Sequence, residues 1–181
     1  MRFLRLRFPE VTRVLVVESG SRHLVEGALP RLRGHLGEHV PFDLVTCYAG
    51  LPAGLDPQSS VVYRIHTYRG RQGRRRLYRE LQASGPSILV MICSGEPIMA
   101  KWKWALALRL PVKVLIVNEN GDYFWFDRSN WKVIRRFTLL RAGLSGGNAV
   151  HTIGRILVFP LTLAYLLLYA AVIHLRRKVR V

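Results

Sequence analysis

Three acidic residues follow apolar, strand-like runs and are the side chains best suited to catalysis in this sequence. Glu18 ends the run TRVLVVE, Glu96 comes shortly after SILVMIC, and Glu119 follows VKVLIVN. The carboxyl ends of parallel strands collect at one edge of a sheet, so these carboxylates are predicted to lie near one another. They could supply a general base or hold a divalent cation. Alternatively, Glu96 and Glu119 are turn and helix-cap residues, and Glu18 pairs with an arginine.

Turns rich in Gly, Ser and Asn follow the same runs and offer backbone N–H groups to an anion. The residues predicted to bind an anion or another ligand are Ser19, Gly20, Ser21, Ser94, Gly95 and Asn120. These turns contain neither the dinucleotide pattern G-x-G-x-x-G nor a phosphate loop with its lysine. NAD and ATP are therefore unsupported, and we expect no cofactor.

Basic and aromatic residues form a second set, which indicates contact with an anionic surface. Arginines recur at four-residue spacing, so they share one helix face. Tryptophans beside lysine and arginine are typical of a membrane–water interface, although they could equally pack a core or cover a partner protein. The residues predicted to meet a membrane or another anionic surface are Arg71, Arg75, Arg79, Trp102, Trp104 and Trp125.

Composition narrows the choice of partner. The 181 residues contain 28 Lys and Arg against 11 Asp and Glu, a net charge of +17, which favours anionic lipid. No nucleic-acid motif accompanies the charge, so nucleic acid is not an expected partner. Cys47 and Cys93 are interpreted as small buried residues in a reducing compartment, with one disulfide as the alternative. They form no metal-ligand spacing with histidine, and no metal is expected.

Apolar runs alternate with helical patterns along the chain. Strands are predicted over 12–18, 42–48, 60–66, 87–93 and 112–118, and helices over 24–36, 70–83, 97–110 and 129–141. Strands that are apolar throughout indicate a parallel sheet covered on both faces. We therefore expect an α/β fold, an open doubly wound sheet in the order 3-2-1-4-5.

The run ILVFPLTLAYLLLYAAVIHL, at 156–175, contains no formal charge and precedes four basic residues. A helix of that length reaches roughly 30 Å, the thickness of a bilayer's hydrocarbon core, so a membrane helix is predicted. A buried core helix is the alternative, and Pro160 leaves open whether the segment crosses or re-enters the bilayer. The expected organisation is an N-terminal arm at 1–11, a Rossmann-like domain at 12–142, a linker at 143–155, the helix, and a basic tail at 176–181.

Arginines at positions 2, 5 and 7 interrupt the first apolar stretch, so a signal peptide is not predicted. The α/β domain is therefore expected to be membrane-associated on the cytoplasmic side.

Two stretches, TRVLVVESGSRHLVEGALPRLRGHL and YRELQASGPSILVMICSGEPIMAKWKWALALRLPVKVLIVN, carry a resemblance to a known family. In layout they resemble the N-terminal, acceptor-side domain of heptosyltransferase-like glycosyltransferases of the B fold. The resemblance implies a Rossmann-like domain that receives a nucleotide sugar only with a second domain. Those enzymes carry a Gly-Asp pair after the first strand, and its Asp acts as the catalytic base. At this position the chain has Ser19-Gly20-Ser21-Arg22. From the sequence we expect no second domain of this kind in these 181 residues.

Three functions are consistent with these observations. The first is a membrane-anchored, glycosyltransferase-like module in envelope glycan or lipid synthesis that depends on a partner chain or is non-catalytic. The second is an accessory or scaffold subunit of a larger membrane complex. The third is a small enzyme that acts on a phosphorylated or lipid substrate through Glu18, Glu96 and Glu119.

Overall fold

The computed structural model describes residues 10–141 and 148–179, including, in the second range, the side chains of 154–155 and 158–171. Most of the predicted arm at 1–11, the first part of the linker at 143–155 and the end of the basic tail lie outside the described residues. The chain divides into two compact units, Met1–Trp131 and Lys132–Val181.

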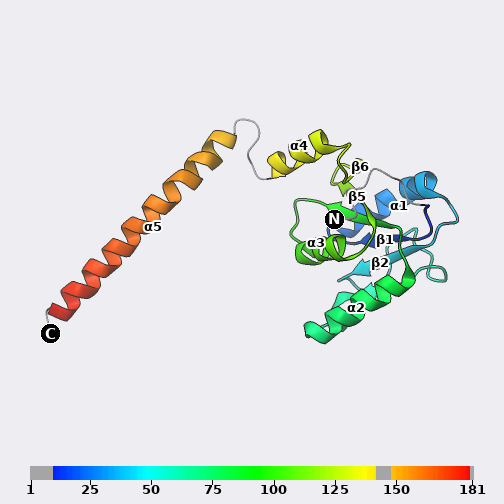
Figure 1. Cartoon of the computed structure of the whole chain (residues 1–181), viewed down its shortest axis with the longest axis horizontal. Coiled ribbons are helices and arrows are strands. Elements are labelled where there is room, and N and C mark those ends of the chain that lie inside the picture. Colours follow the sequence, from blue (N-terminus) through cyan, green and yellow to red (C-terminus); the bar gives the residue numbers. More distant parts are fainter. Residues whose placement is uncertain (1–9, 142–147, 180–181) are drawn as a thin grey trace. The chain divides into compact units, whose positions relative to one another are not determined.

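A six-stranded, mostly parallel sheet forms the centre of the first unit (Figure 1). Its strands are β1 (Val14–Val17), β2 (Phe42–Thr46), β3 (Val62–Arg64), β4 (Ile88–Cys93), β5 (Lys113–Asn118) and β6 (Tyr123–Trp125). They are arranged in the order β3-β2-β1-β4-β5-β6, with neighbouring strands parallel from β3 to β5. The predicted order of five strands is therefore confirmed.

Helices cover both faces of this sheet because the central strands are apolar on both sides. α1 (Arg22–Leu36) buries Val25, Ala28, Leu29 and Leu32 against alternate strand residues such as Val14, Val16 and Val90. The intervening strand residues point to the opposite face. There the other two helices, α2 (Gly70–Ser84) and α3 (Ala100–Arg109), bury their apolar side chains: Leu77, Leu81, Leu106 and Ala107.

The sixth strand was not predicted. β6 pairs antiparallel with β5 across a turn in which Asn118 Oδ1 accepts hydrogen bonds from the amides of Asn120 and Asp122, at 2.9 Å each. Gly121, at φ 78°, completes that turn. Trp125 consequently lies in a sheet edge and packs against the core, not on a free loop.

Three local predictions were wrong. The third strand ends at Arg64 because Ile65–Thr67 form a 3₁₀ turn. α3 begins at Ala100, after Pro97, because Met99 adopts a left-handed conformation (φ 50°) that precedes the helix. Cys47 is exposed although Cys93 is buried as expected, and no disulfide joins the two.

The second unit contains most of α4 (Trp131–Arg141) and all of α5 (Asn148–Val179). α5 includes Pro160 and covers the run at 156–175, although part of that run lies outside the described side chains. Among the described residues, no helix combines the length and hydropathy that crossing a membrane requires. The predicted membrane span therefore has no support from the structure.

A buried ion pair joins β5 to the segment that follows β6. Lys113 Nζ lies 2.8 Å from Asp127 Oδ2, and both side chains are about 5 % exposed or less. Burial alone would raise the pKa of Asp127, but hydrogen bonds from Lys113, Ser129 and the amide of Asn130 lower it below its ordinary value. Asp127 is therefore ionised in the folded protein.

Replacing Asp127 by Asn should destabilise the fold by about 3 kcal/mol at pH 7, because a buried ammonium group loses its counterion. The folded-state pKa of Asp127 is lowered, so the ion pair contributes its full stabilisation at pH values above the unfolded-state pKa of about 3.9. That stabilisation is lost as the pH falls through the folded-state pKa. Urea denaturation followed by tryptophan fluorescence should show the wild type approaching the variant only below about pH 4. Asp122→Asn, in the exposed turn, is the matched control; equal losses for both variants would contradict the assignment.

Candidate functional site

The carboxyl edge of the sheet brings together the loops that follow β1, β4 and β5, as the sequence predicts. Ser21 Oγ donates a hydrogen bond to Glu96 Oε1 at 2.5 Å, which joins the start of α1 to the loop after β4. Glu119 Oε2 accepts a hydrogen bond from the amide of Gly95 at 3.1 Å. The strand order changes direction between β1 and β4, and in open α/β sheets ligands usually bind at this edge beside such a change.

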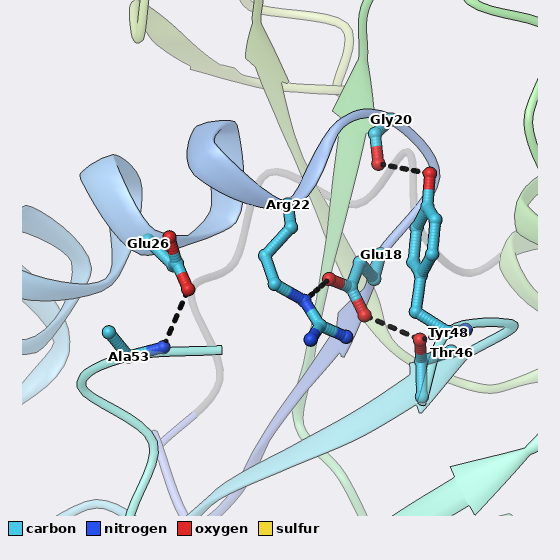
Figure 2. Close-up of polar contacts among 7 residues, drawn as sticks. All are labelled: Glu18, Gly20, Arg22, Glu26, Thr46, Tyr48 and Ala53. Atoms are coloured by element: carbon cyan, nitrogen blue, oxygen red, sulfur yellow. Dashed lines mark hydrogen bonds and ion pairs between the residues drawn. The ribbon is translucent and has the colours of Figure 1, made fainter. Parts of the chain in front are cut away.

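Glu18 is fully buried at this edge and is held by two neighbours (Figure 2). Its Oε1 accepts a hydrogen bond from Arg22 Nε at 2.9 Å, and its Oε2 accepts one from the hydroxyl of Thr46. The hydrogen bond to Glu18 is the main reason that the pKa of Arg22 is raised. Glu18 therefore ties β1 to both α1 and β2, the role that the arginine-pairing alternative describes.

The side chain of Tyr48 lies beside the Glu18–Arg22 ion pair (Figure 2). Its hydroxyl donates a weak hydrogen bond to the carbonyl of Gly20, at 3.4 Å, and the Arg22 guanidinium lies 5.5 Å from the ring centre. The amide of Tyr48 donates to Thr46 Oγ1 at 2.9 Å, so the Thr46 hydroxyl is used as both donor and acceptor. Burial raises the pKa of Tyr48, so the phenol stays neutral at physiological pH.

Ser19 and Gly20 are packing residues of the edge. Ser19 is fully buried, and its hydroxyl donates to the carbonyl of Ile92 at 2.6 Å. A Cβ at Gly20 would lie 2.6 Å from Ser94 Oγ and 3.1 Å from Ile92 Cγ2, so a larger residue would require these side chains to shift. These contacts account for the Ser-Gly-Ser sequence without a bound anion.

Three polar atoms at the edge are buried and have no hydrogen-bond partner in the described part of the chain: Arg22 Nη2, Ser94 Oγ and Glu96 Oε2. They supply a charged donor, a hydroxyl and a carboxylate acceptor. Unpaired polar atoms of this kind are unfavourable in a protein interior. A ligand that paired all three atoms would have to carry both an anionic group and hydroxyl groups.

The three candidate carboxylates do not form a metal site. Within the ranges that the structure describes, no group of three or more His, Cys, Asp or Glu side chains could hold a metal ion. Glu18 is committed to Arg22 and Thr46, and Glu119 contacts Gly95. Asn120 belongs to the β5–β6 turn, where Asn118 accepts its amide hydrogen bond. The divalent-cation option is therefore unsupported.

The predicted arginines lie on α2, where Arg71, Arg75 and Arg79 are exposed. The structure adds Arg109 of α3, whose guanidinium lies 4.6 Å from the centre of the Tyr78 ring. Cavities lined by these side chains lie along α2 and α3.

The three predicted tryptophans lie in different surroundings. Trp102 lies 6.5 Å from Tyr78 on the arginine side, while Trp104 packs edge-on against Phe126 at 5.8 Å. Trp125 lies beneath Lys113 Nζ, which is 5.8 Å from its ring centre. The three therefore do not form one surface, and only Trp104 has 40 % of its area exposed.

Sequence reasoning missed the partners of the predicted residues. Arg22 follows Glu18 by four positions across a strand–helix turn, and its position as the first residue of α1 was the available signal. Tyr48 ends the second predicted strand. Because the carboxyl ends of parallel strands meet at one edge, it could have been predicted to lie in this site. Nothing in the linear sequence places Arg109 beside Tyr78, because they lie on different helices 31 positions apart.

Replacing Glu18 by Gln should lower the free energy of unfolding by about 2 kcal/mol, because a charge-assisted hydrogen bond to a buried group is lost. Glu26→Gln is the matched control, since Glu26 also lies on this side of α1 and its hydrogen bond from the amide of Ala53, at 2.8 Å, is exposed (Figure 2). The control should change stability by less than about 0.5 kcal/mol. Chemical denaturation measures both; an unchanged stability for Glu18→Gln would return Glu18 to the catalytic candidates.

Comparison with known proteins adds no relative: no family model, curated protein or solved structure matches this chain. The likeness to heptosyltransferase-like glycosyltransferases therefore stays a prediction from the sequence.

Proposed function

We propose that this chain is a membrane-associated, glycosyltransferase-like module that acts with a partner chain in envelope glycan or lipid synthesis. The observation that carries the proposal is the apolar surface of α5. Large apolar side chains between Val158 and Tyr169 are 45–71 % exposed, and these include Phe159, Leu161 and Leu168. Exposed contiguous apolar surface of this kind marks contact with lipid or with another protein.

Charge favours lipid as the cover for α5. No acidic residue follows Asp127 in the sequence, whereas ten lysines and arginines do. A helix with apolar side chains and flanking cations binds at the surface of an anionic bilayer without having to cross it. Association through α5, with the α/β unit on the cytoplasmic side, is therefore the form of attachment that we propose.

Dependence on a partner is supported by the state of the edge carboxylates. Glu18 has both oxygens hydrogen-bonded and no exposed surface, so it is poorly placed to accept a proton from a substrate. The segment Ser19–Arg22, where the resembled enzymes carry their catalytic Asp, contributes no acid. A chain built this way suits a binding or positioning role beside a catalytic partner.

Substituting three exposed leucines of α5 should release the protein from vesicles. Leu161→Gln, Leu167→Gln and Leu168→Gln each remove about 1.5–3 kcal/mol of apolar burial, so together they should weaken binding by at least a hundredfold. Flotation with vesicles of phosphatidylglycerol and phosphatidylcholine measures this effect. The matched control combines Val61→Gln, Val133→Gln and Leu140→Gln, which replace exposed apolar residues outside α5. Failure of the wild type to float with any vesicle would refute the proposal.

The unpaired atoms at the sheet edge favour a second candidate function, the binding of a small phosphorylated sugar. Arg22 Nη2 would hold the phosphate, and Ser94 Oγ and Glu96 Oε2 would meet hydroxyl groups. This candidate corresponds to the small-enzyme alternative, with Glu96 as the only one of the three carboxylates that has an unpaired buried oxygen.

Thermal denaturation with millimolar glucose 6-phosphate tests this second candidate. Ligand that binds only the folded state should raise the midpoint of unfolding, and Glu96→Gln combined with Ser94→Ala should abolish the rise. Glu38→Gln with Ser59→Ala, two exposed positions away from the edge, is the control and should retain the full shift. No shift with the wild type, or the same shift with the edge variant, would exclude this sugar phosphate from the edge.

A further inference from the structure

A groove between α2 and α3 gathers arginines that the sequence places on separate elements. On α2, Arg71, Arg74, Arg75, Tyr78 and Arg79 follow one another at spacings of three, one, three and one, which puts them in a single stripe. Two adjoining cavities lie along this stripe, of about 900 Å³ and about 350 Å³. Arg75, Tyr78 and Arg109 line both cavities, and Arg109 brings α3 into the site.

Among the residues that the structure describes, no acidic side chain lines either cavity. The one acid on α2, Glu80, is committed elsewhere: Arg76 Nε lies 2.7 Å from its Oε1, and the Tyr68 hydroxyl donates to its Oε2 at 2.5 Å. The hydrogen bond from Tyr68, and then that from Arg76, lowers the pKa of Glu80, so its charge is present and already paired. The remaining arginines of the groove therefore have an uncompensated positive charge.

This charge opposes formation of α2. Arg71, Arg75 and Arg79 are like charges at four-residue spacing, and each such pair weakens a helix. The first turn contains no acid, and Arg69 provides no side-chain cap, so cations lie at the positive end of the helix dipole. Four of the five arginines of α2 do not share the pairing that Glu80 gives Arg76, and their charges reduce helix stability. We take this as an indication that an external anion compensates them.

Two observations favour the phosphate of a lipid headgroup over nucleic acid as that anion. One face of the Tyr78 ring is covered by Arg109, which reduces the aromatic surface that single-stranded nucleic acid would need for stacking. Trp104 and Leu108, at 40 % and 60 % exposure, share a face of α3 next to the face that carries Ala105 and Arg109. Exposed apolar side chains next to a cationic groove suit a bilayer surface, where both are accommodated.

We propose that the α2–α3 groove binds the phosphate groups of anionic phospholipid headgroups, with Arg71, Arg75 and Arg109 as the principal ligands and Trp104 and Leu108 at the lipid interface. The inference rests on the proposed membrane association and adds to it a defined headgroup site. It predicts that binding depends on anionic lipid through these side chains specifically, not through net charge alone.

The test uses the full chain and flotation with vesicles of phosphatidylcholine alone or with one quarter phosphatidylglycerol. Arg71→Gln, Arg75→Gln and Arg109→Gln remove three charges while keeping long polar side chains. The control, Arg128→Gln, Arg135→Gln and Arg136→Gln, removes three exposed charges elsewhere. Because each cation near an anionic bilayer contributes roughly fivefold, the groove variant should lose about a hundredfold of its phosphatidylglycerol-dependent binding. The control should lose less than about tenfold.

Circular dichroism and the midpoint of thermal unfolding verify folding, and the groove variant should be at least as stable as the wild type because repulsion within α2 is relieved. Equal losses for the groove and control variants would overturn the proposal in favour of unspecific charge. Unchanged vesicle binding with lost binding of a single-stranded RNA oligonucleotide would overturn it in favour of nucleic acid. A wild type that binds no vesicle refutes the membrane proposal itself, whereas a groove variant that floats like the wild type refutes only the headgroup site.

Discussion

Carboxylates are scarce in this chain, and the fold uses its buried ones to neutralise cations. Eleven acidic residues face 28 lysines and arginines. Each of the three buried acids, Glu18, Asp43 and Asp127, lies 2.8–2.9 Å from a basic nitrogen. A buried carboxylate without such a partner would destabilise the fold by several kcal/mol. The acids that hold the sheet together are thus unavailable for proton transfer. In the described part of the chain, Arg71, Arg74, Arg75 and Arg79 of α2 form no ion pair.

The apolar pattern predicted the sheet well because burial on both faces leaves little freedom. Continuous apolar runs such as 88–93 admit only a central strand, and the order from β3 to β5 followed from chain direction and crossover handedness. β6 was not predicted because its three residues, Tyr123–Trp125, are all aromatic and only partly buried. They show no alternation of apolar and polar side chains that would mark a strand. Its position depends on the Asn118 turn, whose side-chain hydrogen bonds direct the chain back along β5.

The candidate site was predictable in place but not in function. The rule that strand ends meet brought Glu18, Glu96 and Glu119 to one edge, yet exposure and partners decide what a carboxylate can do. Whether Glu18 is a base or an anchor depends on Arg22 and Thr46, and Thr46 reaches it only through β1–β2 pairing. Side-chain partners on other elements are set by packing, which a linear pattern does not encode.

The two attachments that we propose gain from being in one chain. A cationic groove alone binds an anionic bilayer weakly and loses that binding as salt screens the charges. An apolar helix surface alone shows little preference among lipids. When both belong to one molecule, the first contact raises the local concentration of the second, and their free energies combine with only a modest further loss of freedom. In this arrangement the groove makes the affinity depend on anionic lipid, while α5 supplies most of the hydrophobic part of the binding free energy. Stable attachment to a membrane surface generally needs two such contributions.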